Sequence, residues 1–63
     1  MKQYQIITKS GQFYIINSQQ DDITELMEII KQKQYTLFEL ACSIEGMKKA
    51  NINRDSIESI TFE

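Results

Sequence analysis

The sequence predicts a small α+β domain in which one helix packs against an antiparallel, strongly curved sheet, with the elements in the order β-β-α-β-β-β. Two runs of alternating apolar and polar residues around a glycine-containing turn predict a β-hairpin over residues 3–17. Apolar residues at three- and four-residue spacing predict a helix over residues 22–33. Turn signals divide the remainder into two or three further strands. The 63 residues suffice for a single domain, residues 1–63.

The hairpin is predicted from strand runs at residues 3–8 and 13–17. A two-residue loop at Ser10-Gly11 suits a tight turn, because glycine accepts the positive φ that such turns need. In the register that this loop sets, Ile7 pairs with Tyr14 and Tyr4 pairs with Asn17. One face then carries the residues that we expect in the core: Tyr4, Ile6, Phe13 and Ile15.

The other face of the predicted hairpin is too apolar to be wholly solvated. It carries three large side chains inside a rim of Gln and Lys residues: Ile7, Tyr14 and Ile16. An apolar centre with a polar rim is typical of protein interfaces, in which Tyr is enriched. We therefore expect this face to contact a partner protein or a second copy in a homodimer, unless a later strand or the helix covers it.

The helix over residues 22–33 has a buried stripe formed by Ile23, Leu26, Met27 and Ile30. Asp21 or Asp22 is a good N-cap, and Glu25 follows Asp22 at capping-box spacing. Lys31 and Lys33 near the end suit the helix dipole.

Residues 35–43 fit two interpretations. As a strand, they place Phe38, Leu40 and Cys42 on one face. As a helix over 36–46, they have Thr36 as a cap and Glu39 in a capping box, which produces a helix-turn-helix arrangement. The strand is favoured, because a turn over 43–47 allows residues 48–53 to return antiparallel, before a second turn at 53–56 and a final strand with Ile57, Ile60 and Phe62.

The composition argues against an enzyme. The chain has no His, no Trp, no Pro and one Cys, Cys42. It therefore lacks the commonest general base and metal ligand, and it has no Cys-based zinc site. Cys42 has no neighbouring base and lies in an apolar stretch, so we expect a buried structural thiol. We predict no catalytic residue, cofactor or metal.

Two charged clusters also have simple structural explanations. Four acidic residues at the start of the helix could suggest a divalent-metal site: Asp21, Asp22, Glu25 and Glu28. Helix capping and a solvent-exposed helix face account for the same residues. Arg54-Asp55 could contact a phosphate, but charged residues in a turn usually face water. Neither cluster is taken as a site.

The net charge of −2 argues against nucleic-acid binding, which usually requires a Lys/Arg-rich face. No apolar run approaches the roughly 18 residues of a membrane span. The single cysteine is typical of a reducing compartment, so we expect a cytoplasmic protein.

Three parts of the chain carry a resemblance: the Lys9-Ser10-Gly11 turn, the acid-capped helix, and the ending Ile52-Asn53-Arg54-Asp55-Ser56-Ile57-Glu58-Ser59-Ile60. With these features the chain resembles short uncharacterised cytoplasmic proteins of low-GC Gram-positive bacteria and their phages. The resemblance implies a strand, a turn and a last strand at the ending. It implies no activity and no functional residues.

Three hypotheses for the function follow. The first is a non-enzymatic protein-interaction module, an adaptor or inhibitor carried by a phage or other mobile element. The second is a nucleic-acid-associated regulator, which requires the basic residues to converge on one face: Lys2, Lys9, Lys48, Lys49 and Arg54. The third is a structural homo-oligomer.

Overall fold

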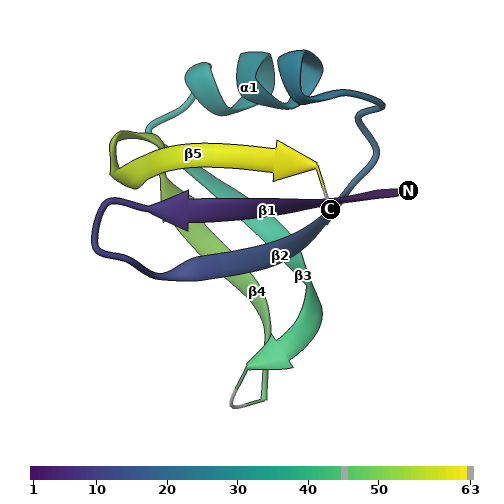
Figure 1. Cartoon of the computed structure of the whole chain (residues 1–63), viewed down its shortest axis with the longest axis vertical. Helices are drawn as coiled ribbons and strands as arrows, with labels where there is room; N and C mark the ends of the chain where they lie inside the picture. The colour runs from purple at the N-terminus through teal and green to yellow at the C-terminus, as the bar shows by residue number, and fades with distance from the viewer. Residues whose placement is uncertain (45, 63) are drawn as a thin grey trace.

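The computed structural model of the chain describes residues 1–44 and 46–62, with the backbone alone for residues 43 and 44. It shows an α+β fold, and the predicted element order is confirmed (Figure 1). The elements are β1 (Lys2–Thr8), β2 (Phe13–Ser18), α1 (Ile23–Lys31), β3 (Tyr35–Ile44), β4 (Met47–Asn53), the short 3₁₀ helix η1 (Arg54–Ser56) and β5 (Ile57–Phe62).

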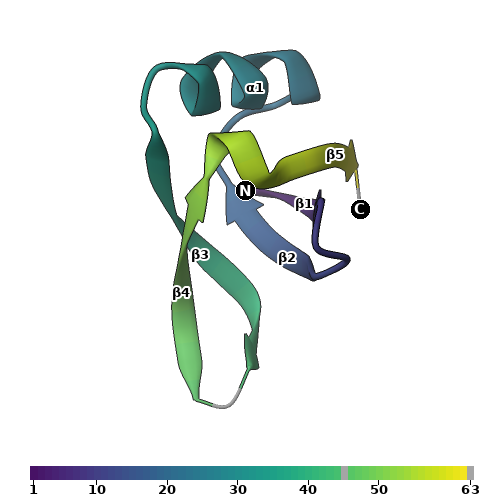
Figure 2. The same cartoon turned by 90° about the vertical axis from the view of Figure 1, so that its left-hand side faces the viewer.

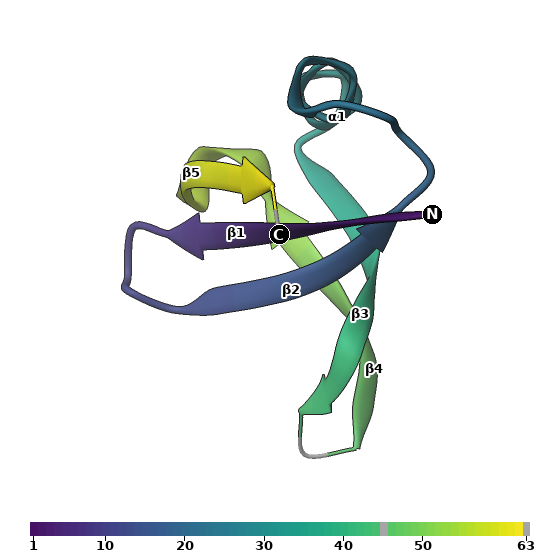
Figure 3. The same cartoon turned by 45° about the vertical axis from the view of Figure 1, so that its right-hand side comes forward.

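The described strands form one antiparallel sheet in the order β4-β3-β2-β1-β5. Strand β5 returns to pair with β1, so β4 and β5 are the two edges. The sheet is neither closed nor strongly curled, so the predicted strong curvature is not confirmed. The β3–β4 hairpin projects away from the rest of the molecule, whereas α1 lies at the opposite end, near β5 (Figures 2 and 3).

The hairpin exists, but its predicted register is wrong by one residue. Its loop is one residue longer than predicted: the Thr8 amide donates to the Gln12 carbonyl at 2.8 Å, and the Gly11 amide donates to the Thr8 carbonyl at 3.0 Å. Gly11 has φ 89°, which is typical of a three-residue loop. Ile7 therefore pairs with Phe13, and Tyr4 pairs with Ile16.

This shift turns β2 over relative to β1, because successive side chains in a strand point to opposite faces. Two predicted core residues, Phe13 and Ile15, lie on the face away from the core, and Phe13 is 60% exposed. Their places on the core face are taken by Tyr14 and Ile16. The buried core consists of Tyr4, Ile6, Ile16, Leu26, Ile30, Phe38, Leu40, Ala50 and Ile52.

Helix α1 begins one residue later than predicted, at Ile23, and ends two residues earlier, at Lys31. The Asp22 carboxylate accepts from the Glu25 amide at 2.8 Å, and the Glu25 carboxylate accepts from the Asp21 amide at 3.3 Å. At the other end, the Gln32 amide donates to the Ile29 carbonyl at 3.2 Å. Of the predicted stripe, Leu26 and Ile30 are buried.

The strand interpretation of residues 35–43 is confirmed by β3, and the helix-turn-helix alternative is wrong for the described residues up to 44. Phe38 and Leu40 alternate into the core. The connection is shorter than the turn predicted over 43–47, because β3 extends to residue 44 and β4 begins at Met47. Residue 45, which both interpretations included, lies outside the described residues.

Candidate functional site

The three residues of the predicted interface do not form one surface. Ile16 is fully buried, and Tyr14 packs against the core on the same face. Ile7 lies on the opposite face, next to Phe13 and near Ile15. The hairpin does have a second apolar face, but the register places Phe13 and Ile15 there instead of Tyr14 and Ile16.

The other singled-out residues do not converge on a chemical site. Cys42 is exposed, so the predicted burial of its thiol is wrong: the part of β3 that carries it lies beyond the core. Asp22 and Glu25 form the helix cap. Within the described residues, no group of three or more His, Cys, Asp and Glu side chains is arranged to hold a metal ion.

The basic residues that nucleic-acid binding would require are dispersed. Lys2 is the first residue of β1, and Lys9 follows its last residue. The two lysines therefore lie at opposite ends of the strand. Lys48 and Lys49 lie at the start of β4, and Arg54 follows the end of that strand. Because Lys48 and Lys49 are consecutive in β4, they point to opposite faces, so these five side chains do not share one face.

A hollow lies between α1 and β5, and we call it the α1–β5 groove. Its volume is about 370 Å³. One wall is the helix, one wall is the strand, and η1 forms one end. The lining residues are Met27, Ile30, Lys31, Arg54, Asp55, Ile57, Glu58, Ser59 and Ile60.

Strand β5 supplies one wall of this groove. Four consecutive residues of the strand, 57–60, line it. Strand β5 pairs with β1 and with no other described strand, so it is an edge strand of the sheet with α1 beside it (Figure 1).

A bulge shapes the strand wall. Ile7 pairs with Ser59 but Thr8 pairs with Ile57, so β5 carries one extra residue, Glu58. The extra residue allows Ile57 and Ile60, which are three positions apart, to pack against the same core. The apolar floor of the groove depends on this irregularity.

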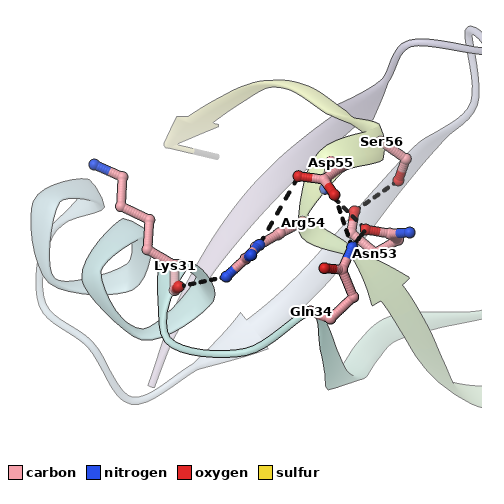
Figure 4. Close-up of polar contacts among 6 residues, drawn as sticks. All are labelled: Lys31, Gln34, Asn53, Arg54, Asp55 and Ser56. Carbon is pink, nitrogen blue, oxygen red and sulfur yellow. Dashed lines mark hydrogen bonds and ion pairs between the residues drawn. The ribbon is translucent and has the colours of Figure 1, made fainter.

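The end of the groove at η1 is held by a polar network (Figure 4). The Asn53 side chain caps η1, because its oxygen accepts from the Asp55 amide at 2.9 Å. The Gln34 amide group donates to Asn53 Oδ1 and to Asp55 Oδ2, at 2.7 Å in each case. These bonds fix the turn against the segment that leaves the helix.

Arg54 connects this turn to α1. Its Nη1 donates to the Lys31 carbonyl at 2.9 Å, and its Nε lies 3.8 Å from Asp55 Oδ1. Arg54 thereby satisfies one of the carbonyl groups that a helix leaves unpaired at its end. The helix wall and the η1 end of the groove are therefore held together by side chains.

The charges at the groove are only partly paired. Arg54 and Asp55 form an ion pair. Neither the Lys31 amine on the helix wall nor the Glu58 carboxylate on the strand wall has an ionic partner within the described part of the chain. Figure 4 shows the Lys31 side chain extending away from Arg54.

A second hollow, of about 240 Å³, lies between the β1–β2 loop and the end of β4. Its polar groups largely bond to one another. The Thr8 hydroxyl bonds with Ser10 Oγ at 2.9 Å, and the Tyr14 hydroxyl donates to Gln12 Oε1 at 3.2 Å.

Sequence reasoning missed this groove, although Met27, Ile30 and Lys31 belong to the predicted helix. The available signal was the spacing of Ile57 and Ile60, which does not fit an uninterrupted strand and marks the bulge. No family model matches the chain, and neither curated proteins nor solved structures include a match. Among the described residues, no helix has the length and apolar character needed to cross a membrane.

Proposed function

We propose that this protein is a small non-enzymatic interaction module, an adaptor or inhibitor, that binds a segment of a partner protein in the α1–β5 groove. One observation carries the proposal: an apolar floor, formed by Ile57 and Ile60, lies beside the exposed Met27 side chain of α1. The compartment in this proposal is the cytoplasm, which suits a chain with a single exposed cysteine.

The two walls of the groove suit peptide binding in different ways. Ile57 and Ile60 are held against the core and form a fixed surface. Met27 is 41% exposed, and its flexible thioether side chain adapts to different apolar partners. The groove volume of about 370 Å³ is at the lower end of the usual range for binding pockets, so it suits one or two side chains of a peptide.

The proposal is tested by selecting short random peptides, displayed on phage, against the immobilised protein. A matched pair of variants reports on the site: Met27 lines the groove and is 41% exposed, whereas Ile29 on the same helix does not line it and is 37% exposed. We expect Met27→Glu to weaken binding of the selected peptides by about tenfold or more, and Ile29→Glu to leave it unchanged. Circular dichroism verifies that both variants fold.

Two results would contradict the proposal. One is that no peptide is enriched over a blank surface. The other is that the two variants bind the selected peptides equally well, which would place the binding site away from the groove.

The second candidate, a structural homo-oligomer, is favoured by the apolar residues on the outer face of the sheet. Phe13 is 60% exposed and lies next to the half-buried Ile7 and Ile15. A second copy that covers this face would remove Phe13 from water. Sedimentation of the wild-type protein and of Phe13→Glu tests it: a dimer that the substitution converts to monomer supports this function, and a monomeric wild type contradicts it.

A further inference from the structure

We infer that the second hollow, which lies between the β1–β2 loop, η1 and the end of β4, binds one uncharged sugar ring. We call this hollow the loop–η1 pocket. The inference goes beyond the proposed function, because the described residues that line this pocket and those that line the α1–β5 groove do not overlap. Three properties of the pocket support it: its lack of charge, its mixture of hydrogen-bond donors and acceptors, and its two aromatic rings.

The first property is the lack of charge. A quarter of the residues in this chain are charged, yet all of the described residues that line the loop–η1 pocket are uncharged. Ligands with a phosphate, carboxylate or ammonium group are usually held by side chains of opposite charge. The charged residues of η1, Arg54 and Asp55, pair with each other and line the α1–β5 groove instead. The loop–η1 pocket therefore suits a neutral ligand.

The second property is the mixture of hydrogen-bonding groups. The Tyr14 hydroxyl donates to Gln12 Oε1 at 3.2 Å, which leaves the Tyr14 oxygen as an acceptor and the Gln12 Nε2 group as a donor. On the η1 side, Asn53 Oδ1 accepts from the Asp55 amide and from Gln34, so the Asn53 Nδ2 group remains as a donor. A hydroxyl group both donates and accepts at one oxygen. A ligand rich in hydroxyl groups therefore matches this lining.

The third property is a pair of tyrosine rings from different strands. Tyr14 in β2 packs against the core, whereas Tyr35 at the start of β3 is 52% exposed. The buried Ile52 adds apolar surface. The face of an aromatic ring carries negative potential, which attracts the weakly positive C–H groups on the apolar face of a sugar ring. A sugar ring thus offers an apolar face to the tyrosines and hydroxyl groups to the amides.

Hydrogen bonds within the chain fix the walls of the pocket. The Lys9 amide donates to the Ser56 carbonyl at 2.8 Å, which joins the β1–β2 loop to η1. Within the loop, the Thr8 hydroxyl bonds with Ser10 Oγ at 2.9 Å. A preformed pocket reduces the entropy that is lost on binding. Its volume of about 240 Å³ equals that of about eight waters at about 30 Å³ each, which is room for one sugar ring.

The inference is tested by saturation-transfer NMR with four neutral sugars: glucose, galactose, mannose and N-acetylglucosamine. Glucose phosphate and uridine serve as comparison probes. We expect at least one neutral sugar to receive saturation from the protein, and glucose phosphate to bind no better than glucose. Titration of isotope-labelled protein with that sugar should shift the amide resonances of Gln12 and Asn51 and leave those of Met27 and Ser59 unchanged, because only the first two residues line the loop–η1 pocket.

A matched pair of variants locates the site. Tyr35 and Leu37 both lie in β3 and are 52% and 62% exposed, but of the two Tyr35 alone is among the described residues that line the pocket. We expect Tyr35→Ala to weaken sugar binding by about tenfold or more, and Leu37→Ala to leave it unchanged. Circular dichroism verifies that both variants fold.

Three results would overturn the inference. The first is that none of the four sugars receives saturation. The second is that Tyr35→Ala and Leu37→Ala affect sugar binding equally. The third is that only uridine or glucose phosphate binds in a Tyr35-dependent way, which would assign the pocket to a flat base or to an anion. Peptide binding and its dependence on Met27 are measured separately, so the failure of sugar binding leaves the proposed function standing.

Discussion

At Tyr4, burial and hydrogen bonding act on one side chain. Its ring is fully buried and meets the Phe62 ring edge-on, with centroids 5.3 Å apart. Its hydroxyl donates to the Gln20 carbonyl at 2.7 Å, in the segment that leads to α1. A hydroxyl buried in this way is stabilising only while it stays neutral and bonded, because a buried charge is costly.

Stability should therefore fall in alkaline solution through Tyr4. Burial raises the pKa of the Tyr4 hydroxyl above its usual value of 10.0, and the nearby carboxylates of Asp22, Asp21 and Glu25 raise it further. The unfolded chain then loses this proton at lower pH than the folded chain, so the contribution is complete below the unfolded pKa and is lost as pH rises toward the folded pKa. Melting temperatures measured from neutral to alkaline pH should decline more steeply for the wild type than for Tyr4→Phe, and parallel curves would refute the assignment.

Substitution of Cys42 should have little effect on the free energy of unfolding. Its side chain is exposed, so replacing sulfur by oxygen changes little buried surface. We expect Cys42→Ser to alter the free energy of unfolding by less than about 0.5 kcal/mol in urea titrations with a reducing agent present. A clearly larger loss would mean that the thiol is covered in solution, for example by another chain.

At the scale of the elements, the length of the β1–β2 loop determines which side chains of β2 face the core. The loop closes through the Thr8 amide and the Gln12 carbonyl, with Gly11 at positive φ. This closure determines which of the β2 residues face the core. The composition of both sheet faces therefore depends on the conformation of a three-residue loop.

Gly11→Ala should destabilise the protein by about 1–2 kcal/mol. An added Cβ at this position meets no atom within 4 Å, so the cost would come from the positive φ alone. Gly11→Asn is the matched variant, because Asn adopts this conformation more readily. Chemical denaturation should rank the stabilities Gly11, then Asn, then Ala, and equal losses for the two variants would mean that φ is not the cause.

At the scale of the whole molecule, stability should differ between its two ends. The helix end contains Leu26 and Ile30, which belong to the buried core, and the η1 network ties the helix to the end of β4. The projecting hairpin carries exposed Cys42, Met47 and Lys48 beyond the core. Segments with few buried apolar contacts open at low free energy.

Amide hydrogen exchange should reveal this difference. We expect the amides of Met47 and Lys48 to exchange much faster than the amides of Ile6 and Ile16, which lie in the two strands beneath the core. Equal protection of both regions would show that the hairpin is covered or that the whole molecule opens as one unit.

The sequence by itself determined the identity and order of the elements. The apolar spacing of Leu26 and Ile30 and the cap at Asp22 are local signals, and they located the start of α1 and its buried side. For residues 35–43, the turn signals that follow them favoured a strand, which β3 confirms. These features depend on residues within a few positions of one another, which is why they can be seen in the chain alone.

Register, edge and groove were decided only by the tertiary structure. The register of β2 depended on whether the loop before it held two residues or three. This difference of one residue placed Ile16 in the core and the predicted core residue Phe13 on the opposite face. The groove depended on β5 pairing with β1, which is distant in sequence, and on a bulge at Glu58. Such pairings are selected by how well the whole molecule buries its apolar surface, so no local pattern contains them.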